Sequence, residues 1–201
     1  MISIVSARFI KSATVPKDFP KLALPEFAFF GRSNAGKSSL INMLLNRKQL
    51  VKTGSRPGMT QTINFFVVNE QTAKNSFVLA DLPGYGFAKV RKNKIAEFEL
   101  MLYNYCKERK NIAVIFLLMD IRRPPQSLEN DIALFFTENA IPFKIVATKA
   151  DKLSKTEQQK SRKALAQAFA LPAEEIIISS TLKKQGREAL LGIIQKHCAD
   201  K

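Results

Sequence analysis

Short apolar runs alternate with amphipathic segments along most of this chain. Strands are predicted where apolar residues run together, and helices where they recur every three or four positions. The predicted strands are 26–31, 62–69, 76–82, 112–119, 143–148 and 175–179. The predicted helices are 37–46, 94–109, 127–139, 156–170 and 186–196. A short polar turn joins the second and third strands, which we therefore expect to pair antiparallel.

This alternation is typical of an α/β protein in which helices cover both faces of a mostly parallel sheet. It predicts a three-layer α-β-α sandwich with a mixed sheet of six strands, one of them an antiparallel edge strand. Residues 1–24 are expected to be a lead-in segment that packs on a single domain of residues 25–201. Residues 4–10 either add a strand or pack on the rim. Ligands of such folds bind at the carboxyl ends of the strands.

The first predicted strand runs directly into a phosphate-binding signature. Its residues are Gly31, Arg32, Ser33, Asn34, Ala35, Gly36, Lys37 and Ser38, which match GxxxxGKS between a strand and a helix. The two glycines are expected to let the backbone curl, so that successive N–H groups face a phosphate. Lys37 would lie on the β- and γ-phosphates, and the Ser38 hydroxyl is suited to Mg²⁺. The segment therefore predicts the P-loop NTPase fold.

A second phosphate-side segment ends the third predicted strand. It consists of Asp81, Leu82, Pro83 and Gly84. A carboxylate at a strand end can hold a water on Mg²⁺, and a glycine can present its N–H to a γ-phosphate because no Cβ blocks the approach. Downstream of a P-loop, this DxxG pattern indicates a γ-phosphate sensor.

A third segment selects the base. Thr148, Lys149, Ala150 and Asp151 follow the strand at 143–148. A carboxylate at Asp151 can accept two hydrogen bonds from guanine, whereas adenine lacks that donor pair. Lys149 can lay its alkyl stem along the base. Thr148 stands where most GTPases have Asn, which predicts modest guanine affinity; Ile178, Ser179 and Ser180 are candidates to offer backbone N–H groups to guanine O6.

The loop between the P-loop helix and the next strand is a candidate switch because it is rich in glycine and proline. It spans residues 53–62, and its candidate nucleotide contacts are Gly58, Met59, Thr60, Gln61 and Thr62. Thr60 is the candidate for a second hydroxyl on Mg²⁺, with Thr62 as the alternative. A second switch is expected over residues 82–93.

Together, GRSNAGKSSLIN, GMTQTINFF, ADLPGYGFA, MDIRRPP and TKAD closely resemble the EngB family of ribosome-biogenesis GTPases, of the TrmE-Era-EngA-EngB-Septin-like group. The resemblance extends from about Ala7 to the C-terminus. TKxD in place of NKxD is itself typical of that family. It implies that Ser38 and Thr60 bind Mg²⁺. It also implies a role in assembling the large ribosomal subunit, with loss affecting cell division and septation.

The residue after DxxG bears on catalysis. Many small GTPases use Gln there to orient the attacking water, but this chain has Tyr85. We therefore expect slow intrinsic hydrolysis, carried by Lys37, Asn34 and Thr60. Potassium beside Asn34 is one hypothesis for the missing positive charge; the alternative is that Asn34 only shapes the loop.

Composition narrows the classes of partner. The 201 residues include 32 Lys and Arg against 17 Asp and Glu, a net charge of +15, which favours anionic partners such as RNA. The excess is concentrated near the expected switches, in Arg47, Lys48, Lys52, Arg56, Lys89, Arg91, Lys92 and Lys94. Arg122 and Arg123 could contact RNA or pair with acids, whereas Glu129, Asp131 and Glu138 are expected to form a solvated helix face.

Several classes are disfavoured. Cys106, Cys198 and a single histidine cannot build a usual zinc site, and the chain is predicted to be reduced, cytoplasmic and monomeric. No apolar run approaches the roughly 20 residues of a membrane span. Two alternatives to a regulatory GTPase remain: a nucleotide-dependent binding module with negligible catalysis, and a P-loop ATPase or kinase.

Overall fold

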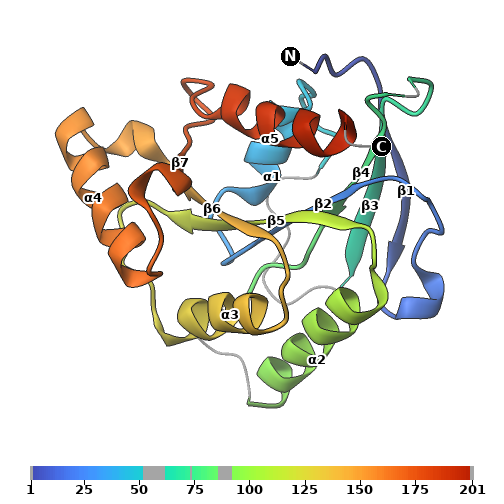
Figure 1. Ribbon diagram of the computed structural model, residues 1–201, viewed down its shortest axis with the longest axis horizontal. Coiled ribbons are helices and arrows are strands. Elements are labelled where there is room, and N and C mark those ends of the chain that lie inside the picture. Colours follow the sequence, from blue (N-terminus) through green and yellow to red (C-terminus); the bar gives the residue numbers. More distant parts are fainter. Residues whose placement is uncertain (1, 52–61, 73, 86–91, 200–201) are drawn as a thin grey trace.

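In the computed structural model, one seven-stranded sheet carries helices on both faces (Figure 1). The structure describes residues 2–51, 62–72, 74–85 and 92–199. The strands are β1 (Ala7–Ala13), β2 (Glu26–Gly31), β3 (Ile63–Val68), β4 (Phe77–Asp81), β5 (Ile112–Asp120), β6 (Phe143–Thr148) and β7 (Ile177–Ile178). The α-helices are α1 (Lys37–Leu44), α2 (Lys92–Glu108), α3 (Ser127–Glu138), α4 (Lys155–Ala168) and α5 (Arg187–Ala199). Short 3₁₀ turns cover Pro16–Asp18, Ala150–Lys152 and Ala173–Glu175.

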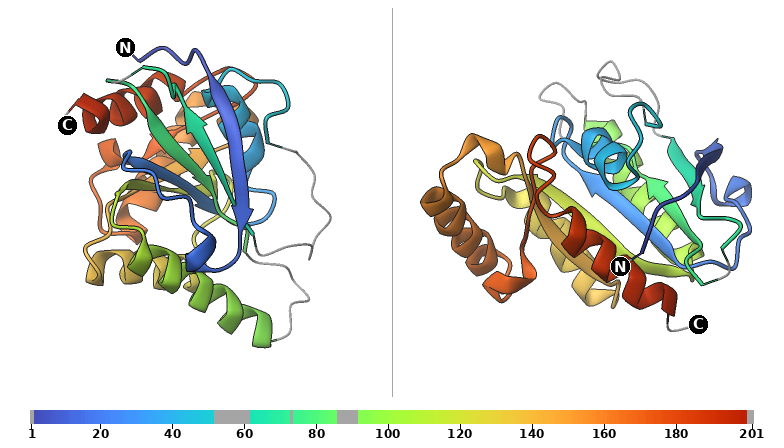
Figure 2. Two further views of the ribbon diagram at one scale, coloured as in Figure 1. Left: turned by 90° about the vertical axis from the view of Figure 1, so that its right-hand side faces the viewer. Right: turned by 90° about the horizontal axis from the view of Figure 1, so that it is seen from above.

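The strand order is β1-β3-β4-β2-β5-β6-β7. Strands β4, β2, β5, β6 and β7 are mutually parallel, whereas β3 pairs antiparallel with both β4 and β1. The predicted α/β sandwich and the antiparallel pairing of β3 with β4 are thus confirmed. The sheet has seven strands where six were expected, because β1, from the lead-in segment, pairs with β3 (Figure 2).

The two faces of the sheet bury different helices. Helices α1 and α5 cover one face, around Phe29 and Phe116. Helices α2 and α3 cover the other, around Phe30 and Leu117, and α4 packs further along that face against Ile145 (Figure 1). A parallel strand covered on both sides must be apolar throughout, and every residue of β2 is buried. Among the described residues, no helix combines the length and apolarity needed to span a membrane.

The amino end of the central strands is closed by a buried ionic network. The Glu26 carboxylate, fully buried, forms an ion pair with Arg109 and accepts a 2.6 Å hydrogen bond from the Tyr105 hydroxyl. Arg109 also donates to the Pro20 carbonyl at 2.8 Å. The network therefore ties the lead-in segment and the end of α2 to the start of β2.

Candidate nucleotide site

The loop between β2 and α1 has the backbone geometry of an anion cradle. Gly36, the residue before α1, has a φ of +89°, and Asn34 has a φ of +66°. The first bond within the helix runs from the Leu40 N–H to the Gly36 carbonyl. The N–H groups of the three preceding residues, starting at Lys37, thus have no acceptor inside the helix and, with the helix dipole, favour an anion.

Gly31 serves a different purpose from the one expected. The left-handed backbone in this loop is at Asn34 and Gly36, and Gly31 is not left-handed. A Cβ at Gly31 would lie 2.7 Å from the carbonyl oxygen of Leu118 on β5. Gly31 is therefore required for the close approach of β2 to β5, which brings the start of the loop against the end of β5.

Lys37, the lysine of the GxxxxGKS segment, meets the carboxylate at the end of β4. Lys37 Nζ forms an ion pair with Asp81, and the two side chains are 13% and 6% exposed. Asn64 on β3 approaches the other oxygen of Asp81 at 3.5 Å. Ser38, in the first turn of α1, is half-buried. A hydroxyl and a carboxylate are the hard oxygen donors that Mg²⁺ prefers, so the described donor set fits that ion.

The segment after Asp81 lies along the P-loop. The Ser33 N–H donates to the Tyr85 carbonyl at 2.8 Å, and the Tyr85 N–H donates to the Gly31 carbonyl at 3.3 Å. A Cβ at Gly84 would lie 2.9 Å from Ser33 Oγ. Gly84 therefore packs closely against Ser33 of the P-loop, and the segment that contains it is hydrogen-bonded to the phosphate cradle through Tyr85.

Tyr85 points away from the nucleotide edge. Its ring is 4% exposed and packs 5.1 Å from Phe30 and 5.8 Å from Phe98, centroid to centroid. Its hydroxyl is buried without a hydrogen bond to any described residue. Burial raises the pKa of Tyr85, and the nearby negative charge of Glu129 raises it further. The side chain is thus a neutral part of the core.

The expectation that Glu129 lies on a solvated helix face is wrong. Glu129 is 4% exposed, whereas Asp131 and Glu138 are exposed as expected. Its carboxylate accepts the Gln126 N–H at 2.9 Å and lies 4.0 Å from the Arg32 guanidinium. Glu129 is buried because it caps the start of α3 directly under the P-loop.

On the base side, Thr148 connects three segments. Its hydroxyl is buried 2.6 Å from the carbonyl oxygen of Ala35 in the P-loop and 2.9 Å from that of Met119 on β5, and one proton serves both. Lys149, with a φ of +62°, places its Nζ 2.6 Å from the Asn34 carbonyl. The threonine therefore fastens the base-recognition loop to the phosphate cradle.

Lys149 also pairs with an aspartate that the sequence analysis did not single out. Asp120 lies 3.1 Å from Lys149 Nζ and accepts two hydrogen bonds from the Arg122 guanidinium, at 2.9 and 2.6 Å. Burial alone would raise the pKa of Asp120, but the hydrogen bonds from Arg122 and Lys149 lower it well below its usual range. Of the two expected roles of Arg122, pairing with an acid is the one observed. The clue in the sequence is an aspartate at the end of an apolar strand.

Asp151, the residue expected to select guanine, is held by Ser180. The Ser180 hydroxyl donates to Asp151 Oδ1 at 2.7 Å, and Lys152 lies 3.8 Å from Oδ2. The hydrogen bond from Ser180 lowers the pKa of Asp151. The Ala150 N–H donates to the Ser179 carbonyl at 3.0 Å, so the two loops are joined. Asp151 is thus a fixed, ionised acceptor.

The loop after β7 is less open than expected. The Ser179 N–H donates to the Ala147 carbonyl at 2.8 Å, and the Ser180 N–H donates to the Gln185 carbonyl at 3.2 Å. Ile178 belongs to β7. Donation from Ser179 or Ser180 to guanine O6 would therefore require these amides to change partners.

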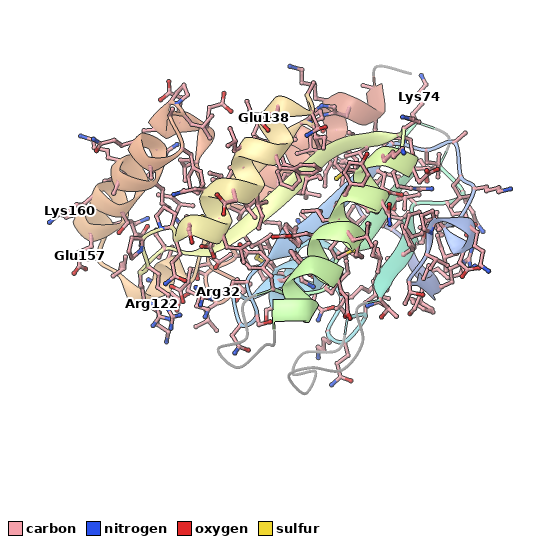
Figure 3. The ribbon with its side chains drawn as sticks, turned by 90° about the horizontal axis from the view of Figure 1, so that it is seen from below. Arg32, Lys74, Arg122, Glu138, Glu157 and Lys160 are labelled. Atoms are coloured by element: carbon pink, nitrogen blue, oxygen red, sulfur yellow. The ribbon has the colours of Figure 1, made fainter. Side chains whose placement is uncertain are left out.

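A cavity of roughly 320 Å³ lies beside the P-loop. Its lining comes from the P-loop, the end of β5, the loop that follows β5 (Arg123 and Pro124), Glu129 on α3, and Lys149. Figure 3 shows Arg32 and Arg122 near each other at one edge of the molecule. Asn34, Ala35 and Lys149 lie in the cavity wall, so the predicted phosphate and base segments are neighbours.

The remaining predicted site residues belong to the candidate switch loop. Gly58, Met59, Thr60 and Gln61 lie outside the described residues. Thr62 is half-buried and directly precedes β3. Among the described residues, no group of three or more His, Cys, Asp or Glu is arranged to hold a metal ion.

Comparisons with known proteins agree with this geometry. Residues 26–149 match the family model described as a 50S ribosome-binding GTPase. A probable GTP-binding protein EngB from Treponema denticola is 48% identical over 97% of this chain and 99% of its own. A second, from Desulforapulum autotrophicum, is 49% identical over 93% of this chain and 94% of its own.

Solved structures support the same assignment. The crystal structure of a probable GTP-binding protein EngB superposes with a TM-score of 0.68 at 26% identity, covering 88% of this chain and all of that one. Era from Aquifex aeolicus, at 23% identity and a TM-score of 0.67, covers 86% of this chain and 56% of its own, and it shares the fold. The chain belongs to the EngB family of P-loop GTP-binding proteins.

Proposed function

We propose that this protein binds GTP and GDP, hydrolyses GTP slowly and acts as a nucleotide-gated factor in assembly of the large ribosomal subunit. The observation that carries the guanine preference is the ionised Asp151, held by Ser180 at the edge where the P-loop lies. The family description of a 50S ribosome-binding GTPase supports the ribosomal partner. A role in cell division and septation belongs to the same proposal.

In the proposed mechanism, the N–H groups at the start of α1 bind the β-phosphate and Lys37 compensates the charge of the β- and γ-phosphates. Ser38 and Thr60 would hold Mg²⁺, and Asp81 would orient one of its waters. Bound Mg²⁺ would supply compensation for charge developing on the transferred phosphate. The Gly84 N–H would donate to the γ-phosphate, since the segment that contains it is hydrogen-bonded to the P-loop.

Slow hydrolysis is proposed because Tyr85 is packed in the core and no glutamine follows Gly84. Asn34 is exposed at the tip of the P-loop, and potassium beside it is one source of the missing positive charge. GTP turnover should then be several-fold faster in K⁺ than in Na⁺ buffer. Equal rates would mean that Asn34 only shapes the loop. In that role its carbonyl accepts a hydrogen bond from Lys149 Nζ.

Nucleotide gating is tested by sedimentation with purified 50S subunits. Binding should be tighter with a non-hydrolysable GTP analogue than with GDP, because ordered switches would align more cations with phosphates. Reversing the charges of Lys89, Arg91 and Lys92 should weaken subunit binding but leave GTP binding intact. Equal sedimentation and equal salt dependence in both nucleotide states would contradict gating.

Two alternatives are separated by simple assays. A binding module with negligible catalysis would show no single-turnover hydrolysis with or without subunits, a possibility that the buried Tyr85 keeps open. An ATPase or kinase would bind ATP in competition with GTP. We further propose a cytoplasmic monomer with one GTPase domain at residues 25–201, on which residues 1–24 pack through β1.

A further inference from the structure

A second group of basic residues, apart from those near the expected switches, lies on the base side of the nucleotide site. Three segments follow the carboxyl ends of β5, β6 and β7: residues 121–126, residues 149–155, which end on the first residue of α4, and residues 179–186. They are called the three loops below. Together they contain seven Lys or Arg and a single acid, Asp151. The whole chain has 32 cations to 17 acids, so these loops are far more basic than the average.

The opposite edge of the same half of the sheet has no such excess. The segments that enter β5, β6 and β7 are residues 109–111, 139–142 and 169–176. They contain two cations, one of them the buried Arg109, and two acids. In Figure 3, Glu138 lies at the edge of the molecule opposite to Arg122. On the β5–β7 half of the sheet, the basic excess is therefore confined to the carboxyl edge.

Most of these cations are not neutralised by the fold. Arg123, Lys155, Lys183 and Lys184 are exposed and form no ion pair with any described residue. Arg122 and Lys152 each approach an aspartate yet remain 42% and 56% exposed. Leu182, beside Lys183, is the most exposed large apolar side chain described, at 77%. An exposed leucine beside a lysine suits contact with a nucleotide, because the leucine can pack on the sugar while the lysine pairs with the phosphate.

The three loops are fastened to one another. The Ile121 N–H donates to the Thr148 carbonyl at 3.0 Å, and the Ala150 N–H donates to the Ser179 carbonyl at 3.0 Å. Ser180 and Gln185 exchange two backbone hydrogen bonds across the last loop. The cations are thus placed by the β5–β7 half of the sheet, and none of these bonds involves residues 53–62 or 82–93.

We propose that Arg122, Arg123, Lys152, Lys155, Lys183 and Lys184 form a docking surface for the phosphate backbone of RNA that works in every nucleotide state. The inference rests on the proposed function, in which RNA is a partner, and adds a second, ungated contact to the gated one at the switches. RNA is favoured over an anionic membrane because the cations lie on three loops along an edge, whereas interfacial binding uses a helix with a broad apolar face.

The test compares two triple variants of equal charge. One is K155Q/K183Q/K184Q, which changes exposed cations that do not line the cavity beside the P-loop. Its control is K17Q/K110Q/K196Q, which removes three exposed cations elsewhere. Binding of a fluorescein-labelled 20-nucleotide single-stranded RNA is measured against salt concentration, with GDP and with a GTP analogue. In the surface variant, the negative slope of log K against log salt should become smaller in magnitude by about 2, because each phosphate contact on a single strand contributes about 0.7.

The control should keep the wild-type slope, both variants should keep wild-type GDP affinity, and the loss should be equal in the two nucleotide states. An equal loss in both variants would attribute binding to net charge and overturn the proposal. So would unchanged RNA binding together with lost binding to phosphatidylglycerol vesicles. If wild-type protein binds neither this RNA nor 50S subunits, the proposed function fails as well. If wild-type protein binds this RNA and the surface variant binds it equally well, this inference fails alone.

Discussion

The two ends of the parallel strands carry ionic networks of opposite character. At the amino end, Glu26 and Arg109 are almost fully buried, and their bonds all run to other parts of the protein. At the carboxyl end, Arg122 and Lys149 are 42% and 31% exposed beside Asp120. The first network closes the fold, whereas the second leaves charge that a ligand can meet. Burial, more than charge, therefore separates a structural network from a binding one.

The largest effect is expected from breaking the closed network. Replacing Arg109 with Met leaves Glu26 as an uncompensated buried carboxylate, which should cost about 3–5 kcal/mol of unfolding free energy. Urea denaturation measures this loss. The control is Arg8→Met, which removes an ion pair with Glu70 between side chains 60% and 49% exposed and should leave the midpoint unchanged. Equal effects of the two substitutions would contradict the comparison.

The next effect is expected at the phosphate cradle and should appear in binding. Lys37→Met removes a charge-assisted contact to the phosphates, so GTP affinity should fall by about 1.5–3 kcal/mol, or roughly 10- to 150-fold. Titration with a fluorescent GTP analogue measures it, with Lys110→Met as control. A large loss of stability without nucleotide, and little loss of affinity, would place Lys37 among the structural residues instead.

A third substitution tests the connection between the two halves of the site. Thr148→Val keeps the shape but removes the hydroxyl that donates to the buried carbonyls of Ala35 and Met119. We expect a loss of about 1–2 kcal/mol in stability and a faster release of GDP. Thr137→Val removes a comparable hydroxyl bond, to Ala133, on an exposed part of α3 and serves as control. Identical GDP release rates in the two variants would show that Thr148 does not hold the cradle.

The smallest effect concerns pH. Ser180 lowers the pKa of Asp151, so the carboxylate stays ionised as the solution becomes acidic, and guanine binding is lost only when pH falls through that lowered pKa. In Ser180→Ala the pKa should rise, and GDP affinity should begin to fall at a higher pH than in the wild type. Titration of GDP binding from pH 8 downward checks this. If GDP affinity falls at the same pH in the wild type and in Ser180→Ala, Ser180 has no role in keeping Asp151 ionised.

Much of the fold was predictable because strand and helix periodicities are local. Strands β2 and β6 have the predicted bounds, and the other elements differ mainly at their ends. Helix α1 stops at Leu44 rather than at 46, where Asn46 adopts a φ of +51°. Strand β7 is shorter than predicted because only Ile177 and Ile178 pair with β6. These ends depend on pairing partners that no local pattern contains.

The residue types of the candidate site and their order along the chain were determined by the sequence alone. A glycine-rich turn, a lysine and a hydroxyl must follow a strand to bind a phosphate, and this requirement is local. Only the tertiary structure decided that Gly31 is needed for packing on Leu118, that Glu129 is buried beneath the P-loop, and that Ser180 holds Asp151. Each of these depends on the distance between segments that are remote in sequence, and packing of the sheet and its helices sets that distance.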